Sequence, residues 1–203
     1  MPTPIGHALA GVATAWAADL FPGDRRWRTA SASASWYLRA GNGLTFACLA
    51  LAVVPDVDLV YLAINAEGHR TITHSVGAVV FAGLLAAAIA MKARRPVARV
   101  VLMCAAAYAT HLLLDWLGAD NTPPRGLQLL WPFSHAFYIS DLDLFPPTVR
   151  HHILTAPIIR VNLRAIAYEI AILLPIVVAL WLVRVKALAR FAAEMPRGNH
   201  APQ

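Results

Sequence analysis

The residues best suited to chemistry in this sequence are histidines and aspartates that interrupt long apolar runs. Imidazole nitrogens and carboxylate oxygens together are typical ligands of zinc, manganese or iron. We therefore predict a divalent metal site, with Zn²⁺ as the first choice and Mn²⁺ or Fe²⁺ as alternatives. The candidate ligands are His7, Asp56, Asp58, His69, His74, His111 and Asp115.

His111 and Asp115 form the strongest local pattern. At a spacing of four residues on a helix they share one face, about 5–6 Å apart at Cβ. An imidazole and a carboxylate placed in this way can bind one cation or bracket two. The alternative is a hydrogen-bonded pair that only packs helices, although ionisable groups inside a membrane indicate function by default.

Two further carboxylates follow a proline in the stretch Pro55-Asp56-Val57-Asp58. Proline disfavours an unbroken helix, and in an extended or turn geometry both side chains can point the same way. Two carboxylates in an apolar segment need a counter-charge, which a divalent cation would supply. Either Asp56 or Asp58 could instead act as a general base. The alternative is a helix that ends at the membrane interface, with both carboxylates solvated.

A heptapeptide, His-Arg-Thr-Ile-Thr-His-Ser, holds two more histidines. Because His69 and His74 are five residues apart, they diverge by about 140° if both are helical. We expect one on the entering loop and the other in the first helical turn. Arg70 could stabilise negative charge on a substrate through its planar fork, or be an interfacial arginine. Thr73 and Ser75 are expected to cap the helix start.

Three ionisable residues stand alone in apolar segments. His7 is as readily a packing residue as a ligand. We count it as a candidate ligand because it is expected on the same membrane face as the other candidate ligands. Glu169 is interpreted as an interfacial residue, with a counter-charge or an acid–base catalyst as alternatives. Asp19 receives no assignment.

The composition indicates a membrane protein. Of the 203 residues, 59% are apolar and 14% charged, against roughly 45–50% and about 25% in soluble globular proteins. The mean hydropathy is +0.57, and these values exclude disorder and an ordinary soluble domain. The 17 Lys and Arg residues give a net charge of +6 and lie in short clusters, unlike the basic patch of a nucleic-acid binder. Cys48 and Cys104 are interpreted as packing residues.

Five apolar segments approach the length of about 20 residues that a helix needs to cross a bilayer. We therefore predict an all-α polytopic membrane bundle of about four to five transmembrane or re-entrant helices, forming one domain over residues 1–203. One long connection, 118–164, joins the last two segments. The segments are 5–21 (spanning or re-entrant), 44–64, 72–91, 97–117 and 165–183.

The basic residues predict the orientation. Twelve of the 17 lie in three connections that five alternating spans place on one side, and the positive-inside rule makes that side cytoplasmic. The amino terminus and residues 118–164 are then outside, the tail 184–203 is cytoplasmic, and all seven candidate ligands converge on the outer face. The twelve are Arg25, Arg26, Arg28, Arg39, Lys92, Arg94, Arg95, Arg99, Arg184, Lys186, Arg190 and Arg197.

A set of motifs occurs in a fixed order along the chain. They are His7, Pro55-Asp56-Val57-Asp58, His69-Arg70-Thr71-Ile72-Thr73-His74-Ser75, His111-Leu112-Leu113-Leu114-Asp115 and Leu129-Leu130-Trp131-Pro132-Phe133-Ser134. Together they resemble the LexA-regulated, inner-membrane-associated metal-dependent hydrolases, over about residues 1–135 in motifs and the whole chain in hydropathy. The resemblance implies a small multispanning protein of the bacterial or archaeal inner membrane with a metal-dependent hydrolytic site.

A looser similarity is to the zinc-dependent phospholipases C, in which His, Asp, His and His-x-x-x-Asp occur in the same order. The later His and His-x-x-x-Glu ligands of that family have no match after Asp115. The similarity therefore implies one or two metals here rather than three.

These observations together predict a hydrolase in which metal-activated water attacks an ester or phosphodiester, lipid-derived in one version, at the outer membrane face. The expected partners are membrane lipid and a small-molecule or lipid-like substrate, with no nucleic acid. One alternative is a transporter or an ion or proton pathway that uses the same cluster, and another is a purely structural metal. The polar groups collect at one end of the segments, which favours a site over a pathway.

Overall fold

The computed structural model describes residues 1–20, 39–58, 69–149 and 154–193, and within these ranges every regular element is helical. The all-α prediction is therefore confirmed. The α-helices are α1 (Pro4–Ala17), α3 (Gly43–Val53), α5 (Val76–Lys92), α6 (Val97–Leu117) and α7 (Ala156–Ala193). Short 3-10 helices are η1 (Ala18–Leu20), η3 (Val54–Val57) and η4 (Ile72–His74).

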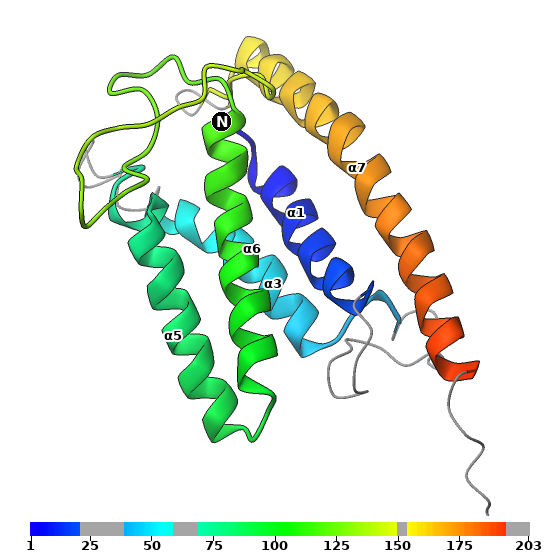
Figure 1. The fold of residues 1–203 in the computed structure, drawn as a ribbon. Coiled ribbons are helices and arrows are strands. Elements are labelled where there is room, and N and C mark those ends of the chain that lie inside the picture. Colours follow the sequence, from blue (N-terminus) through cyan, green and yellow to red (C-terminus); the bar gives the residue numbers. More distant parts are fainter. Residues whose placement is uncertain (21–38, 59–68, 150–153, 194–203) are drawn as a thin grey trace, which may run out of the picture.

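The helices form a bundle with α1, α3 and α6 packed on one another at its centre (Figure 1). Helix α5 packs against α6 on one side, and α7 packs against α1 on the other. Gly11 allows the close approach of α1 and α3, because a Cβ atom there would lie 2.7 Å from the carbonyl oxygen of Cys48. Both Cys48 and Cys104 are buried and free, as expected of packing residues.

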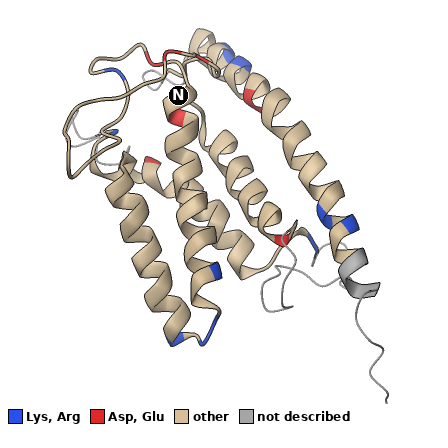
Figure 2. Ribbon diagram, viewed as in Figure 1, with Lys and Arg blue, Asp and Glu red and all other residues tan. Residues whose placement is uncertain are grey.

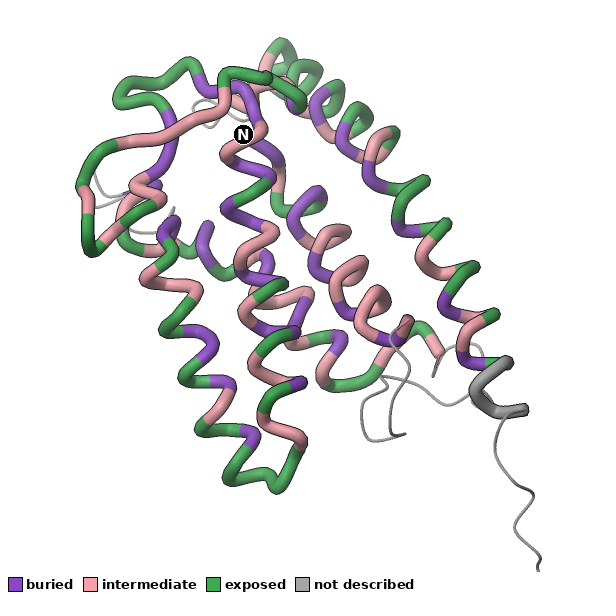
Figure 3. The backbone as a smooth tube through the Cα atoms, in the orientation of Figure 1, coloured by how far each residue is buried: buried purple, intermediate pink, exposed green. Residues whose placement is uncertain are grey.

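Among the residues that the structure describes, two helices are long and apolar enough to cross a membrane. They are α6 and the part of α7 from Ala156 to Ala189, whereas α5 and Gly43–Val57 are shorter apolar helices. Figure 3 shows exposed positions along the outer faces of α5 and α7, and many of these are large apolar residues such as Phe81 and Leu182. Apolar side chains on an outer face suit contact with lipid.

The helix bounds correct the expected segments at several ends. Helix α7 begins at Ala156 rather than 165, so the long connection is shorter than 118–164. Pro157 in the first turn is compatible with a helix start, because proline lacks an N–H that would be unbonded there anyway. Helix α3 ends at Val53 and continues only as η3, in agreement with the helix-breaking effect of Pro55.

The connection after α6 folds over one end of the bundle (Figure 1). Its backbone makes isolated pairings, Gly118 with Phe145 and Leu127 with Tyr138. Leu127 and Phe145, both in this connection, are themselves buried. The connection thus covers the end of the bundle at which α6 finishes.

Basic residues gather at the opposite end, where the turn between α5 and α6 carries Lys92, Arg94 and Arg95 (Figure 2). Arg25, Arg26 and Arg28, on which the orientation also depends, lie outside the described residues. Which end of the bundle faces the cytoplasm stays a prediction.

Candidate metal centre

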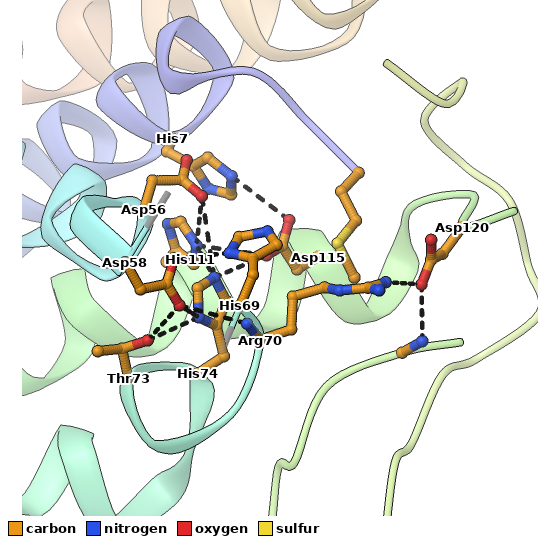
Figure 4. Close-up of polar contacts among 12 residues, drawn as sticks. His7, Asp56, Asp58, His69, Arg70, Thr73, His74, His111, Asp115 and Asp120 are labelled. Carbon is orange, nitrogen blue, oxygen red and sulfur yellow. Dashed lines mark hydrogen bonds and ion pairs between the residues drawn. The ribbon is translucent and has the colours of Figure 1, made fainter. Parts of the chain in front are cut away.

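The structure brings the seven predicted ligands together at the end of the bundle that the connection covers (Figure 4). They come from five separate places in the chain. Helix α1 supplies His7, η3 and its C-cap supply Asp56 and Asp58, the loop before η4 supplies His69, η4 supplies His74, and α6 supplies His111 and Asp115.

One group of ligand atoms belongs to His7, His111 and Asp115, which are all fully buried. Asp115 Oδ1 lies 3.5 Å from His7 Nε2, and Asp115 Oδ2 lies 3.3 Å from His111 Nε2. The two imidazole rings stack with their centroids 3.7 Å apart. His111 Nδ1 donates to the carbonyl oxygen of Ala52 at 2.8 Å, which leaves the Nε2 lone pair directed at Asp115.

The second group belongs to Asp56, His69 and His74. It is contiguous with the first, because His74 Nε2 lies 3.1 Å from His111 Nε2 and 3.5 Å from Asp115 Oδ2. Asp56 Oδ1 lies 3.8 Å from Nε2 of both His74 and His111. The two groups therefore form one continuous cluster of nitrogen and oxygen donors.

Several of these potential metal-binding atoms are buried and have no hydrogen-bond partner in the described part of the chain. They are both ring nitrogens of His7, one oxygen of Asp56 and both oxygens of Asp115. A buried polar atom without a partner is destabilising by about 1–3 kcal/mol, and more if it is charged. A divalent cation would satisfy these atoms, and the mixed His and Asp donor set suits zinc, manganese or iron. The residues present therefore fit a metal.

The two aspartates after Pro55 differ in their partners. The backbone there is a 3-10 turn rather than extended, and Asp56 reaches the cluster whereas Asp58 contacts His69 and the backbone N–H of Arg70. Asp58 lies beyond the end of η3.

Arg70 forms an ion pair with Asp120, a residue that the sequence did not single out. Its guanidinium pairs with the buried carboxylate of Asp120 and also donates to the carbonyl oxygen of Thr122 at 3.2 Å. Asp120 in turn accepts from the backbone N–H groups of Thr122 at 3.0 Å and Gly126 at 2.8 Å. The prediction that Arg70 binds negative charge on a substrate stays a prediction.

Two residues were expected to cap the helix that follows His74, and only one of them does. Ser75 Oγ accepts from the backbone N–H of Ala78 at 3.1 Å, so its predicted role is confirmed. Thr73 does not cap the helix, because its hydroxyl donates to Asp58 Oδ2 at 2.7 Å. The Leu-Trp-Pro-Phe stretch supplies the other acceptors: the N–H of Gly77, for example, donates to the carbonyl oxygen of Trp131 at 3.1 Å.

Glu169 and Asp19 also acquire partners. Glu169 is fully buried and accepts from the backbone N–H and the hydroxyl of Thr3, at 2.9 and 2.6 Å, at the start of α1. Asp19 is fully buried at the opposite end, 2.9 Å from Arg99 and 2.7 Å from Arg184. Neither belongs to the metal-ligand groups, and the interfacial interpretation of Glu169 gives way to a buried helix-capping carboxylate.

Comparison with known proteins identifies a family. The model of a family described as YdjM inner membrane protein matches residues 1–191, which is nearly the whole chain. Neither the curated proteins nor the solved structures include a match to this sequence.

Proposed function

Because this chain belongs to the YdjM inner membrane protein family, which is the LexA-regulated membrane-bound metal-dependent hydrolase family, we propose that it hydrolyses an ester or phosphodiester at a metal centre. One observation carries the proposal. Buried nitrogen and oxygen atoms without hydrogen-bond partners among the described residues, from His7, Asp56 and Asp115, converge on the imidazoles of His74 and His111. Such a set of donors is stable when a cation neutralises it.

In this proposal the metal is held by His7, His111 and Asp115 on one side and by Asp56, His69 and His74 on the other. A bound divalent metal lowers the pKa of water toward about 7 and so supplies hydroxide at neutral pH. The protein's contribution is to hold the ligands in place and to exclude bulk water. Asp56 is the carboxylate we assign to proton transfer if it does not ligate, since its Oδ1 has no hydrogen-bond partner among the described residues.

The proposed substrate is lipid-derived or lipid-like. Two features support it: the cluster lies at one end of a bundle whose outer faces are apolar, and candidate spans α6 and α7 end there. A site so placed can be reached by an ester or phosphodiester at the level of lipid headgroups. We also propose that the site lies at the extracytoplasmic face of the membrane, with the amino terminus outside and the carboxyl terminus in the cytoplasm.

The first test is the metal content of the detergent-purified protein, compared with the His111→Ala, Asp115→Ala double variant. We expect one or two equivalents of metal in the wild type and none in the double variant, together with loss of phosphodiesterase or esterase turnover. A third preparation, with the exposed Asp141→Asn, controls for purification.

Metal retained at the wild-type level in the double variant would overturn the ligand assignment. A wild type that never binds metal, in buffers free of chelator, would overturn the hydrolase and favour the transport alternative. Ion flux into liposomes would then be the next measurement.

A further inference from the structure

The carboxylate of Asp58 stands out in the cluster because, among the described residues, N–H and O–H groups of the protein surround both of its oxygens. Oδ1 lies 2.6 Å from His69 Nδ1. Oδ2 lies 2.7 Å from the hydroxyl of Thr73, 3.1 Å from His74 Nδ1 and 3.2 Å from the backbone nitrogen of Arg70. Figure 4 shows Asp58 beside these groups, on the far side of His74 from Asp115.

These contacts leave no room for a cation on Oδ2. A carboxylate oxygen offers about two lone-pair positions. The Thr73 hydroxyl and the Arg70 N–H already donate to this atom, and His74 Nδ1 lies 3.1 Å away. Asp56, two residues earlier, is the opposite case, since its Oδ1 is buried and accepts no hydrogen bond within the described residues. The two aspartates of one motif thus have different environments.

The contacts of Asp58 also determine which ring nitrogen of each histidine is available. A neutral imidazole has one N–H and one lone pair. His74 Nδ1 lies 3.0 Å from the Thr73 hydroxyl oxygen and 3.1 Å from Asp58 Oδ2. Because the Thr73 hydroxyl donates its own hydrogen to Asp58, Nδ1 of His74 carries the N–H, and the lone pair lies on Nε2, which is the atom 3.5 Å from Asp115 Oδ2 and 3.8 Å from Asp56 Oδ1. His69 also turns its Nδ1 toward Asp58. Carboxylates in this position orient metal-binding histidines and raise their basicity.

We propose that Asp58 is a positioning residue that holds His69 and His74 with Nε2 directed at the metal, and that Asp58 is not itself a ligand. This inference rests on the metal centre of the proposed function and assigns its two neighbouring carboxylates separate roles. Asp56 binds the metal, and Asp58 orients the two imidazoles that bind beside it.

The test compares Asp58→Asn with Asp56→Asn in the full chain, purified in detergent and loaded with Zn²⁺ or with Co²⁺ as a spectroscopic probe. We expect Asp58→Asn to keep the wild-type number of equivalents and the same Co²⁺ absorption bands, with affinity about 10- to 100-fold weaker in chelator competition. Asp56→Asn should lose an equivalent or shift the bands, because a ligand is removed.

Asp58→Asn behaving like Asp56→Asn, with an equivalent lost or the bands displaced, would overturn the inference while leaving the metal centre in place. A wild type without metal would overturn the proposed function and this inference with it. A wild type that binds metal without hydrolysing any substrate would leave the assignment of Asp58 standing, since neither measurement uses turnover.

A second variant covers the case in which Asp58→Asn does not fold. Thr73→Val keeps the shape of the side chain but removes the hydroxyl that donates to Asp58 Oδ2 and lies 3.0 Å from His74 Nδ1. If Asp58 positions the histidines, Thr73→Val weakens metal affinity severalfold and leaves the stoichiometry unchanged. An affinity that is unchanged or raised in Thr73→Val would overturn the inference, since that is the effect expected when a hydrogen bond competing with a metal on Asp58 is removed.

Discussion

At the scale of single residues, the buried pair of Arg70 and Asp120 joins the ligand loop to the connection that covers it. Arg70 has a left-handed backbone, with φ of 65°, and its own N–H and C=O are bonded to Asp58 and Gln128. A non-glycine residue in this conformation is uncommon and is held by its surroundings. The residue next to His69 is therefore fixed by contacts on both its backbone and its side chain.

Replacing Asp120 by Asn should destabilise the protein and weaken metal binding. The substitution removes the charge that balances a buried guanidinium, a change that typically costs about 3–5 kcal/mol. Thermal unfolding in detergent and chelator competition measure the two effects. Asp141→Asn is the matched control in the same connection, because its pair with Arg125 is exposed, at 65% and 50%, and should matter by less than about 1 kcal/mol. Equal unfolding temperatures for the two variants would contradict the prediction.

The sequence singled out the seven candidate ligands that the structure brings together, but not the residues that support them. His111 and Asp115 are conspicuous because charged groups are rare in apolar runs. Asp120 lies in a polar connection and bonds to a residue 50 positions away, and Glu169 bonds to one 166 positions away. No local pattern encodes such distances. The separate roles of Asp56 and Asp58 likewise depend on a turn geometry that the sequence left open.

At the scale of the helices, the start of α5 determines where His74 lies. Its first N–H groups are bonded to the carbonyl oxygens of Leu129 and Trp131, at 2.8 and 3.1 Å, rather than left to water. Gly77 permits this contact, since a Cβ atom there would lie 2.8 Å from the Trp131 ring. The Leu-Trp-Pro-Phe stretch therefore serves as a backbone cap for the helix that follows the ligand.

Gly77→Ala should destabilise the protein by about 1–3 kcal/mol, the usual effect of an added methyl group in a filled space. Gly83→Ala, in the same helix, is the control, because its nearest neighbour would be 3.6 Å away at Val101. An alanine there should be neutral or stabilising by up to about 1 kcal/mol, since alanine favours helix more than glycine. Thermal unfolding of both variants in one detergent measures the difference. Indistinguishable unfolding curves would show that Gly77 is not needed for the contact with Trp131.

Helix positions were predictable where apolar length alone determines them. The segment 97–117 coincides with α6. The start of α7 was placed too late, at 165 rather than 156, because Arg160 and Arg164 lower the local hydropathy although arginine is a good helix former. Whether α1, α3 and α5 cross the bilayer depends on depth and tilt, which hydropathy does not determine.

At the scale of the whole molecule, a buried ion cluster lies at the end opposite the metal centre. Asp19 in η1 contacts Arg99 of α6 and Arg184 of α7, and the Arg184 guanidinium lies 5.7 Å and 5.3 Å from the ring centroids of Trp16 and Trp181. One carboxylate thus links three helices. Neutralising it leaves two buried guanidinium groups without that carboxylate.

Asp19→Asn should therefore lower the free energy of unfolding by about 3–5 kcal/mol. Arg99→Met should have a smaller effect, because the contact between Asp19 and Arg184 survives and the arginine stem is replaced by an apolar one of similar length. Denaturant or thermal unfolding of the purified variants gives the comparison. An Arg99→Met protein as unstable as Asp19→Asn would show that Asp19 does not carry the cluster.

A buried carboxylate joins α1 to α7 at each end of α1. Glu169 of α7 holds the first turn of α1 through Thr3, and Asp19 beyond the last turn of α1 holds Arg184 of α7. Tilting one helix against the other would break a contact at one end or the other. Since His7 lies one turn from Thr3, the pairing of α1 with α7 sets the height at which His7 enters the candidate metal centre.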